Sequence, residues 1–279
     1  MKIKITAVAV ASLAVSSAFA QTTIYSNSPT GDAFTNAGSS GAFQTVASPT
    51  GFANASWYYS EVKNGGIVGI DGANPRTGSE NGSAHFNVAA NALGGRADME
   101  LRDTTAGYLG LFDNVTAWSV DTYTLSGDIP NSALNLRMEL YNPNNNMYGN
   151  LVFDPTDTPS FNTPVTGLQW NTFDFFSAGN TYKLNATSSL GAAYGALLSG
   201  GTPMTFASWQ SALAGQGFLV LSVDMGWGTA TSAFEGYADN YALGFGGQTQ
   251  TYNFEVVPEP ATMAVLALPA LAALRRRKK

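Results

Sequence analysis

Two acidic residues, Asp98 and Glu100, stand two positions apart in a segment that alternates polar and apolar side chains. In an extended strand this spacing puts both carboxylates on one face, about 6–7 Å apart, a separation that glycoside hydrolysis can use. Sandwich glycosidases of the Glu-x-Asp-x-x-Glu type carry a third acid, whereas Leu101, Arg102 and Asp103 follow here. Because Arg102 shares the strand face and can neutralise the pair, we expect no catalysis from these residues.

His85 is the only histidine, and the chain has no cysteine. These counts exclude multi-histidine and thiolate zinc sites, and a serine triad would have to use His85 itself. The sequence has no Gly-x-Ser-x-Gly elbow and no Gly-rich phosphate loop. Since His85 alternates with Phe86 in an apolar segment, we interpret it as an ordinary strand residue.

Trp57, Tyr58 and Tyr59 form a run of three aromatic residues. Exposed aromatic rings can stack on sugar rings, so this run is a candidate carbohydrate platform. Aromatic side chains also dominate the cores of folded domains. Both interpretations stay open at the level of the sequence.

The N-terminus has the three parts of a secretory signal peptide. Two lysines precede an apolar stretch over residues 5–15, and Ala18 and Ala20 form the small-x-small pattern that signal peptidase accepts. Residues 1–20 are therefore predicted to be removed by signal peptidase, with Gln21 first in the mature chain. The apolar stretch is shorter than the about 20 residues of a transmembrane helix.

The C-terminus is also tripartite. Its parts are an extended motif (Val257, Pro258, Glu259, Pro260), an apolar segment over residues 261–274, and a basic stop (Arg275, Arg276, Arg277, Lys278, Lys279). As a helix the apolar segment would reach about 21 Å, against a hydrocarbon core of about 30 Å. The cations favour the cytoplasmic side, so we expect only transient insertion into the membrane.

This order of VPEPAT, apolar stretch and basic end resembles the PEP-CTERM sorting signal. The resemblance implies processing by exosortase, a multi-pass membrane protease of the cysteine type that cuts near the Pro-Glu-Pro element and discards the tail. Together with the signal peptide, it implies a protein secreted to, or displayed on, the surface of a Gram-negative bacterium by way of the inner membrane. An ordinary tail anchor is the alternative.

The central region resembles known proteins at three segments. Residues 54–63, 74–78 and 234–245 are similar to a group of exported PEP-CTERM proteins without an assigned activity. The last segment is also similar to the Asp-Asn-bearing final strand of laminin-B-like and galactose-binding-like sandwiches, in which an acid at the position of Asp239 helps to hold a structural calcium. An inward carboxylate needs a partner or a metal, so Asp239 either binds calcium with loop oxygens or is a hydrogen-bonded strand-end residue.

The charge of the mature domain is more acidic than that of the whole chain. The full sequence has a net charge of −6, but seven of its 13 basic residues lie in the two terminal signals. The remaining core keeps six basic and 18 acidic residues and carries −12. Such a surface repels phosphate backbones, which argues against nucleic-acid binding, and it is compatible with calcium.

Period-two alternation predicts a domain made of strands. We expect one helix, over residues 206–213, and turns at Asn64-Gly65-Gly66 and Gly246-Gly247. The sets predicted to share a strand face are Leu134, Leu136, Met138 and Leu140; Leu219, Leu221, Val223 and Met225; Tyr237, Asp239, Tyr241, Leu243 and Phe245; and Tyr252, Phe254 and Val256.

The predicted fold is all-β: a two-sheet antiparallel sandwich of the jelly-roll type. It is flanked by the signal peptide and by a short apolar C-terminal helix. The expected divisions are residues 1–20 for the signal, 21–50 for a loose lead-in and first strand, 51–256 for the sandwich and 257–279 for the sorting signal.

The resemblance to PEP-CTERM proteins implies, as the favoured function, a non-enzymatic surface or extracellular-matrix protein associated with exopolysaccharide or biofilm, without a cofactor other than a structural calcium. A carbohydrate-binding, lectin-like module is the alternative. A polysaccharide-active enzyme is the second alternative.

Overall fold

The computed structural model describes residues 20–46, 55–77, 80–91, 93–127, 132–155, 167–198, 203–230 and 232–258. Most of the predicted signal peptide, including Ala18, lies outside these residues. So do Glu259, Pro260, the apolar segment and the basic stop. The expected C-terminal helix therefore falls outside the described part of the chain.

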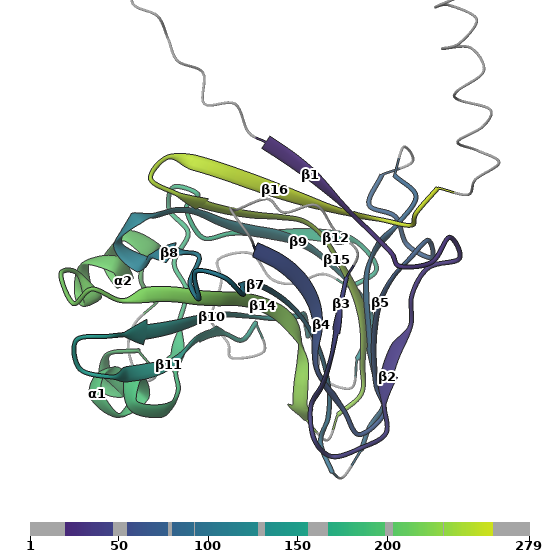
Figure 1. Cartoon of the computed structure of the whole chain (residues 1–279), viewed down its shortest axis with the longest axis horizontal. Helices are drawn as coiled ribbons and strands as arrows, with labels where there is room; N and C mark the ends of the chain where they lie inside the picture. Colours follow the sequence, from purple (N-terminus) through teal and green to yellow (C-terminus); the bar gives the residue numbers. More distant parts are fainter. Residues whose placement is uncertain are drawn as a thin grey trace, which may run out of the picture.

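The described residues form two packed sheets, each of eight strands (Figure 1). The path through sheet A is β1 (Ala20–Tyr25), β16 (Gln248–Glu255), β15 (Phe234–Phe245), β6 (Ser83–Val88), β5 (Gly66–Asp71) and β2 (Phe34–Asn36). On the other edge of β15 lie β9 (Val115–Gly127) and then β12 (Trp170–Asp174). The first strand, β1, pairs with β16 in parallel, and the other pairs among the described strands are antiparallel.

Sheet B runs in the order β13 (Asn185–Ala186), β11 (Met147–Phe153), β10 (Asn135–Asn142), β14 (Leu219–Ala230), β7 (Gly95–Asp103), β4 (Ala55–Lys63) and β3 (Ala42–Thr45). A two-residue strand, β8 (Gly110–Leu111), pairs with the start of β14. The long strand β14 therefore lies between β10 and β7. The predicted all-β, two-sheet class is confirmed.

Aromatic side chains join the two sheets. Trp57 of sheet B is fully buried and meets Tyr241, Tyr252 and Phe254 of sheet A edge-on, with ring centroids 5.2–5.3 Å apart. The buried Trp118 indole N–H donates to the Tyr241 hydroxyl at 2.7 Å. Because edge-on aromatic pairs are favourable beyond the area they bury, this cluster fixes how the sheets pack.

Two helices and one 3-10 turn cover one end of the sandwich. Helix α2 (Phe206–Leu213) has the predicted bounds and buries Phe206, Trp209 and Leu213. Thr205 caps it by accepting a hydrogen bond from the Ser208 backbone N–H. The second helix, α1 (Ser188–Leu198), was not predicted, since its Gly- and Ala-rich sequence lacks a clear apolar stripe. The 3-10 turn η1 (Phe112–Asn114) lies beside α2.

A bulge in β14 corrects one predicted strand face. Glu139 lies opposite Ser222 and Leu140 opposite Val220, so Leu221 is an extra residue without a partner. The bulge turns Val220 into the core, where it is fully buried, and leaves Leu221 on the outer side. Leu219 and Leu221 therefore do not share a face with Val223, contrary to the alternation.

A second bulge, in β15, corrects another predicted face. The register against β9 shifts between Asp239 and Ala242, and Asn240 adopts a positive φ of 49°. Before the bulge Tyr237 stacks on His85, and after it Tyr241 packs against Trp57 between the sheets. The predicted set from residue 237 to residue 245 is therefore split by the bulge.

Within the predicted lead-in over residues 21–50, the structure describes the residues up to 46. They contribute three strands, β1, β2 and β3, to the two sheets. None of the helices within the described ranges is long and apolar enough to cross a membrane.

Candidate functional site

The outer face of sheet B carries a row of polar and charged side chains. On β7 and β10 the alternate residues Met99, Leu101, Leu136 and Met138 pack into the core, which turns the residues between them outward. Those on the outer face are Asp98, Glu100 and Arg102 of β7, Ser222 and Asp224 of β14, and Arg137 and Glu139 of β10. The prediction that Asp98, Glu100 and Arg102 share a face is confirmed by this register.

Two adjoining hollows open on this face. The first, of about 320 Å³, is lined by Phe43, Glu61, Arg96, Glu100, Arg102, Glu139, Tyr148, Asn150, Ser222 and Asp224. The second, of about 400 Å³, is lined by Phe43, Tyr58, Arg102, Asp103, Thr104, Gly107 and Leu221. Because they share Phe43 and Arg102, we treat them as one feature, the sheet-B groove.

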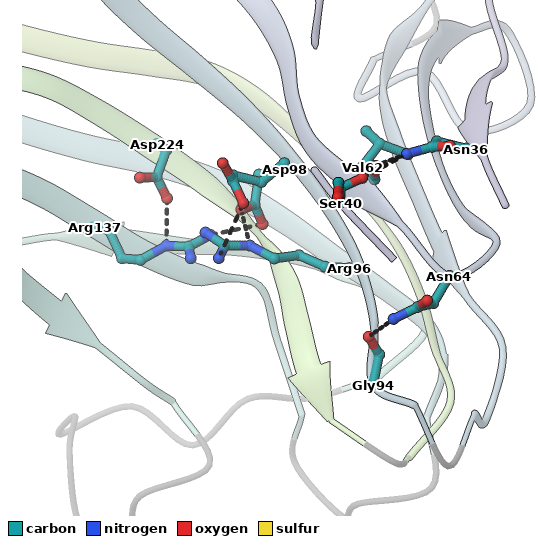
Figure 2. Close-up of polar contacts among 10 residues, drawn as sticks. Asn36, Ser40, Val62, Asn64, Gly94, Arg96, Asp98, Arg137 and Asp224 are labelled. Carbon is teal, nitrogen blue, oxygen red and sulfur yellow. Dashed lines mark hydrogen bonds and ion pairs between the residues drawn. The ribbon is translucent and has the colours of Figure 1, made fainter. Parts of the chain in front are cut away.

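A buried ion-pair network adjoins this groove (Figure 2). It connects Arg96 and Asp224, which line the groove, through Asp98 and Arg137. The Arg137 guanidinium pairs with Asp98 at 2.6 Å and with Asp224 at 2.5 Å, while the Arg96 Nε reaches Asp98 at 2.5 Å from the other side. Asp98 is only 1% exposed. Burial raises the pKa of Asp224 to about 7, against the opposing effect of Arg137. A carboxylate enclosed by two guanidinium groups, such as Asp98, is not free to act as an acid or a base.

Glu139 is held at the wall of the groove by two neutral hydroxyl groups. The Tyr148 hydroxyl donates to its Oε1, and the Ser222 hydroxyl donates to its Oε2 at 2.9 Å. The hydrogen bond to Glu139 raises the pKa of Tyr148 to about 12. Sequence reasoning did not single out Glu139 or Tyr148, although the alternation in β10 already placed Glu139 on the polar face.

Glu100 lies on the same face, on the other side of β14. Its nearest cation is Arg102, with 3.7 Å between the Arg102 Nε and the Glu100 carboxylate. Burial raises the pKa of Glu100, and Arg102 opposes this effect only in part. Glu100 and Glu139 therefore sit in one groove but in different electrostatic surroundings.

Exposed aromatic rings mark the groove. Phe43, on the edge strand β3, is 51% exposed, and Tyr148 is 40% exposed. Monomeric proteins keep most large aromatic rings inside, and rings that remain exposed beside a polar hollow are suited to stacking on a ligand. Neither residue was predicted, because the sequence around them gives no aromatic cluster.

The predicted carbohydrate platform is divided by the fold. Trp57 and Tyr59 are fully buried, and the Tyr59 hydroxyl donates to Asp32 at 2.6 Å, so the platform hypothesis is wrong for these two. In β4 alternate residues face opposite sides, which places Tyr58 on the outer face, where it lines the groove. The core alternative is confirmed for Trp57 and Tyr59.

His85 links neighbouring strands of sheet A. Its Nδ1 lies 2.6 Å from Asp71 and its Nε2 lies 3.2 Å from Glu235, while its ring stacks on Tyr237. The hydrogen bond from His85 contributes to a lowered pKa of Asp71, against the desolvation that opposes it. These cross-strand contacts fit the interpretation of His85 as a strand residue.

Asp239 fills the gap where the pairing of β15 with β16 stops. Its Oδ1 accepts the backbone N–H of Phe254 at 3.0 Å and that of Asn240 at 2.7 Å. Among the described residues its buried Oδ2 has no hydrogen-bond partner, and burial raises the pKa of Asp239 to about 8.

The described residues contain no group of three or more acidic or histidine side chains that could hold a metal. A calcium ion at Asp239 would therefore need Oδ2 and backbone or amide oxygens. Calcium binding stays a prediction, and equal melting temperatures with calcium and with chelator would contradict it.

The predicted signal-peptidase site and the start of the sorting motif lie at one edge of sheet A. Ala20 and Gln21, at the predicted signal-peptidase site, open β1, and β1 pairs with β16 along its length. The strand β16 leads directly into the sorting motif, and the Val257 backbone N–H donates to the Ser26 hydroxyl at 2.9 Å. Of the four residues of the extended motif, Val257 and Pro258 lie within the described ranges.

Comparison with known proteins identifies the tail. Residues 256–279 match the PEP-CTERM protein-sorting motif. The chain therefore carries the sorting signal of an exported protein that is processed by exosortase and directed to the cell envelope or surface. No curated protein matches the sequence.

Among solved structures, a β-1,2-glucanase from Parabacteroides distasonis aligns with 81% of this chain and 24% of its own, at 10% identity and a TM-score of 0.35. The chain thus spans about a quarter of that protein's length. A similarity of this size carries no argument about activity.

Proposed function

We propose that the exported protein is a non-catalytic component of the cell surface or extracellular matrix, and that it associates with exopolysaccharide or biofilm through the sheet-B groove. The observation that carries this proposal is an open polar groove bordered by exposed aromatic rings, on a chain with an exosortase sorting signal. This proposal combines the matrix role with the carbohydrate binding that the sequence analysis gave as an alternative.

The composition of the groove suits a sugar polymer. Sugar rings present apolar faces that stack on aromatic rings, and hydroxyl groups that hydrogen-bond with carboxylates, amides and guanidinium groups. Phe43 and Tyr148 supply exposed rings, while Asn150 and Arg102 supply polar groups. The hollows continue into each other at Phe43 and Arg102, so an extended chain of several sugar units fits better than a compact ligand.

The ion pairs of the groove favour binding over catalysis. Asp98, the sequence candidate for acid or base chemistry, is buried between Arg96 and Arg137. Asp98 is therefore not available as the second catalytic carboxyl group beside Glu100. Of the two acids that the sequence suggested, Asp98 is thus better suited to a structural role in the ion-pair network than to catalysis.

Co-sedimentation of the exported protein with exopolysaccharide from its own host tests the proposal. Replacement of the exposed ring in Phe43→Ala should lower the bound fraction several-fold. The matched control is Leu168→Ala, which also removes an exposed apolar side chain. Leu168 lies beside sheet A, where its backbone N–H donates to the Thr124 carbonyl of β9. Equal binding by the two variants would overturn the role of the groove.

A polysaccharide-active enzyme is the second candidate. The observation in its favour is that Glu100, with a raised pKa, and Glu139 face one groove from β7 and β10. Retaining and inverting glycosidases use two such carboxyl groups. Release of reducing ends from the host exopolysaccharide by the exported protein, and its loss in Glu100→Gln, would replace the non-catalytic proposal by this one.

A further inference from the structure

The cations of the sheet-B groove are all engaged by carboxylates of the protein. Arg137 pairs with Asp98 and Asp224, Arg96 with Asp98 and Glu61, and Arg102 with Glu100. Six carboxylates, those of Glu61, Asp98, Glu100, Asp103, Glu139 and Asp224, stand against these three guanidinium groups in and beside the groove. A guanidinium group that already holds a carboxylate at 2.5–2.6 Å, as Arg137 does, offers little to an anionic ligand.

Two groove carboxylates form no ion pair within the described residues, Asp103 and Glu139. Asp103 is 6% exposed and its Oδ1 accepts the backbone N–H groups of Thr105 and Ala106, so the more accessible of the two is Glu139. Within the described part of the chain it forms no ion pair, and both of its oxygens accept hydrogen bonds from neutral hydroxyl groups, those of Tyr148 and Ser222. Each carboxylate oxygen has a second acceptor position, so Glu139 can still receive donors from a ligand. Its negative charge is oriented by the protein but not neutralised by it.

An exposed aromatic ring stands next to this charge. Tyr148 contacts Glu139 through its hydroxyl group and is 40% exposed. A ring beside a fixed carboxylate can hold a sugar unit by its apolar face while the carboxylate accepts from a substituent. If the substituent is a cation, the ring face attracts it as well.

We propose that the sheet-B groove selects a polysaccharide that carries free amino groups, with the ammonium group of an amino sugar seated on Glu139. This inference rests on the proposed function, because it names the class of sugar that the groove takes. An amine would meet an accessible carboxylate that has no cation, whereas the carboxylate of a uronic acid would meet Glu139 and Glu100 as a like charge. The net charge of −12 in the mature core adds attraction for an amine-bearing polymer and repulsion for an acidic one.

Calorimetric titration of the exported protein tests the inference with three hexasaccharides: glucosamine, N-acetylglucosamine and galacturonic acid. The glucosamine hexamer should bind at least about 10-fold more tightly than the N-acetylated hexamer, which corresponds to about 1.4 kcal/mol. The galacturonic acid hexamer should bind most weakly. Glu139→Gln should remove the preference for the amine.

Two further variants make the result specific. Glu235→Gln removes the same charge from sheet A, where Glu235 contacts His85, and should keep the preference. Tyr148→Phe keeps the ring and deletes the hydroxyl that orients Glu139, so it should lower the preference with little change in the binding of the N-acetylated hexamer. An equal effect of Glu139→Gln and Glu235→Gln would show attraction by net charge alone and would overturn the inference.

The remaining outcomes separate the two proposals. Equal binding of the glucosamine and N-acetylglucosamine hexamers, or tighter binding of the galacturonic acid hexamer, would overturn selection for an amine and leave a polysaccharide-binding groove. Absence of binding by all three hexamers, together with no sedimentation on the host exopolysaccharide, would overturn the proposed function itself.

Discussion

Replacement of Arg137 by methionine should destabilise the protein strongly and in a manner that depends on pH. The Arg137 side chain is 13% exposed and pairs with both Asp98 and Asp224 (Figure 2). Methionine retains much of the apolar volume but leaves two buried carboxyl groups without this cation. Loss of one partner from a buried ion pair costs about 3–5 kcal/mol, and we expect a loss of this size at pH 8.

The pH dependence follows from the raised pKa of Asp224, about 7 in the folded protein against 3.8 in the reference state. A carboxyl group with a raised folded pKa binds its proton more tightly in the native state, so stability falls as pH rises from about 4 towards 7. Without Arg137 the pKa of Asp224 rises further. Because Asp224 can take up a proton at pH 5, the loss should be smaller there than at pH 8.

Urea-induced unfolding of wild type and variants at pH 5 and pH 8 measures these losses. The matched control is Arg102→Met, because Arg102 is 44% exposed and its nitrogen lies 3.7 Å from Glu100. Because the cation of this pair is exposed and its separation is long, its loss should cost less than the loss of Arg137, about 1 kcal/mol, although Glu100 itself is buried. If the two methionine variants lost equal stability, or if the loss in Arg137→Met did not change with pH, the network would not be buried and charged as the structure shows.

Three more predictions follow from other parts of the molecule. Trp57→Ala should cost about 3–5 kcal/mol in urea unfolding, since Trp57 joins the sheets, and a loss below about 1 kcal/mol would contradict its buried position. Asp239→Asn keeps the oxygen that accepts from Phe254, but the asparagine cannot ionise. The free energy of unfolding of the variant should therefore rise relative to that of the wild type between pH 5 and pH 8, and a constant difference would exclude the raised pKa of Asp239. Protein recovered from its native envelope should have a mass that lacks the basic end, and a mass that includes Lys279 would refute exosortase processing.

The regular parts of the fold were predictable from the sequence because their side-chain period is local. Leu134, Leu136, Met138 and Leu140 alternate with polar residues, and all four are buried. The helix over residues 206–213 was found from its apolar spacing and has the predicted bounds. In both cases one face of one element meets the core, so the sequence pattern and the burial agree.

Bulges limited the prediction of strand faces. Leu221 and Asn240 each interrupt the alternation of a long strand, and the residues on either side of them change faces. Neither bulge contains a glycine that would have announced it. Asn240 has a positive φ, and its backbone N–H donates to the Asp239 carboxylate. The same carboxylate accepts the Phe254 N–H of β16 in place of a backbone carbonyl. This arrangement depends on a second strand and is not visible in the local sequence.

The groove could not be predicted, because it depends on which strands are neighbours in sheet B. Glu100 and Glu139 are far apart in the chain and come together only because β14 lies between β7 and β10. The sequence pointed to Asp98 as a reactive acid, but Arg137, from a different strand, neutralises it. The C-terminal sorting signal could be identified directly, because the order of its proline-rich, apolar and basic segments carries the information without tertiary structure.

Hydroxyl-radical footprinting of the exported protein, with and without its host exopolysaccharide, tests most directly whether the sheet-B groove holds the polymer. The polymer should reduce oxidation of Phe43 and Tyr148, which are exposed at the groove, and leave Leu93 and Leu168, which are exposed elsewhere, unchanged. Protection of Leu93 and Leu168 with unchanged oxidation of Phe43 and Tyr148 would place the polymer on another surface and contradict the groove.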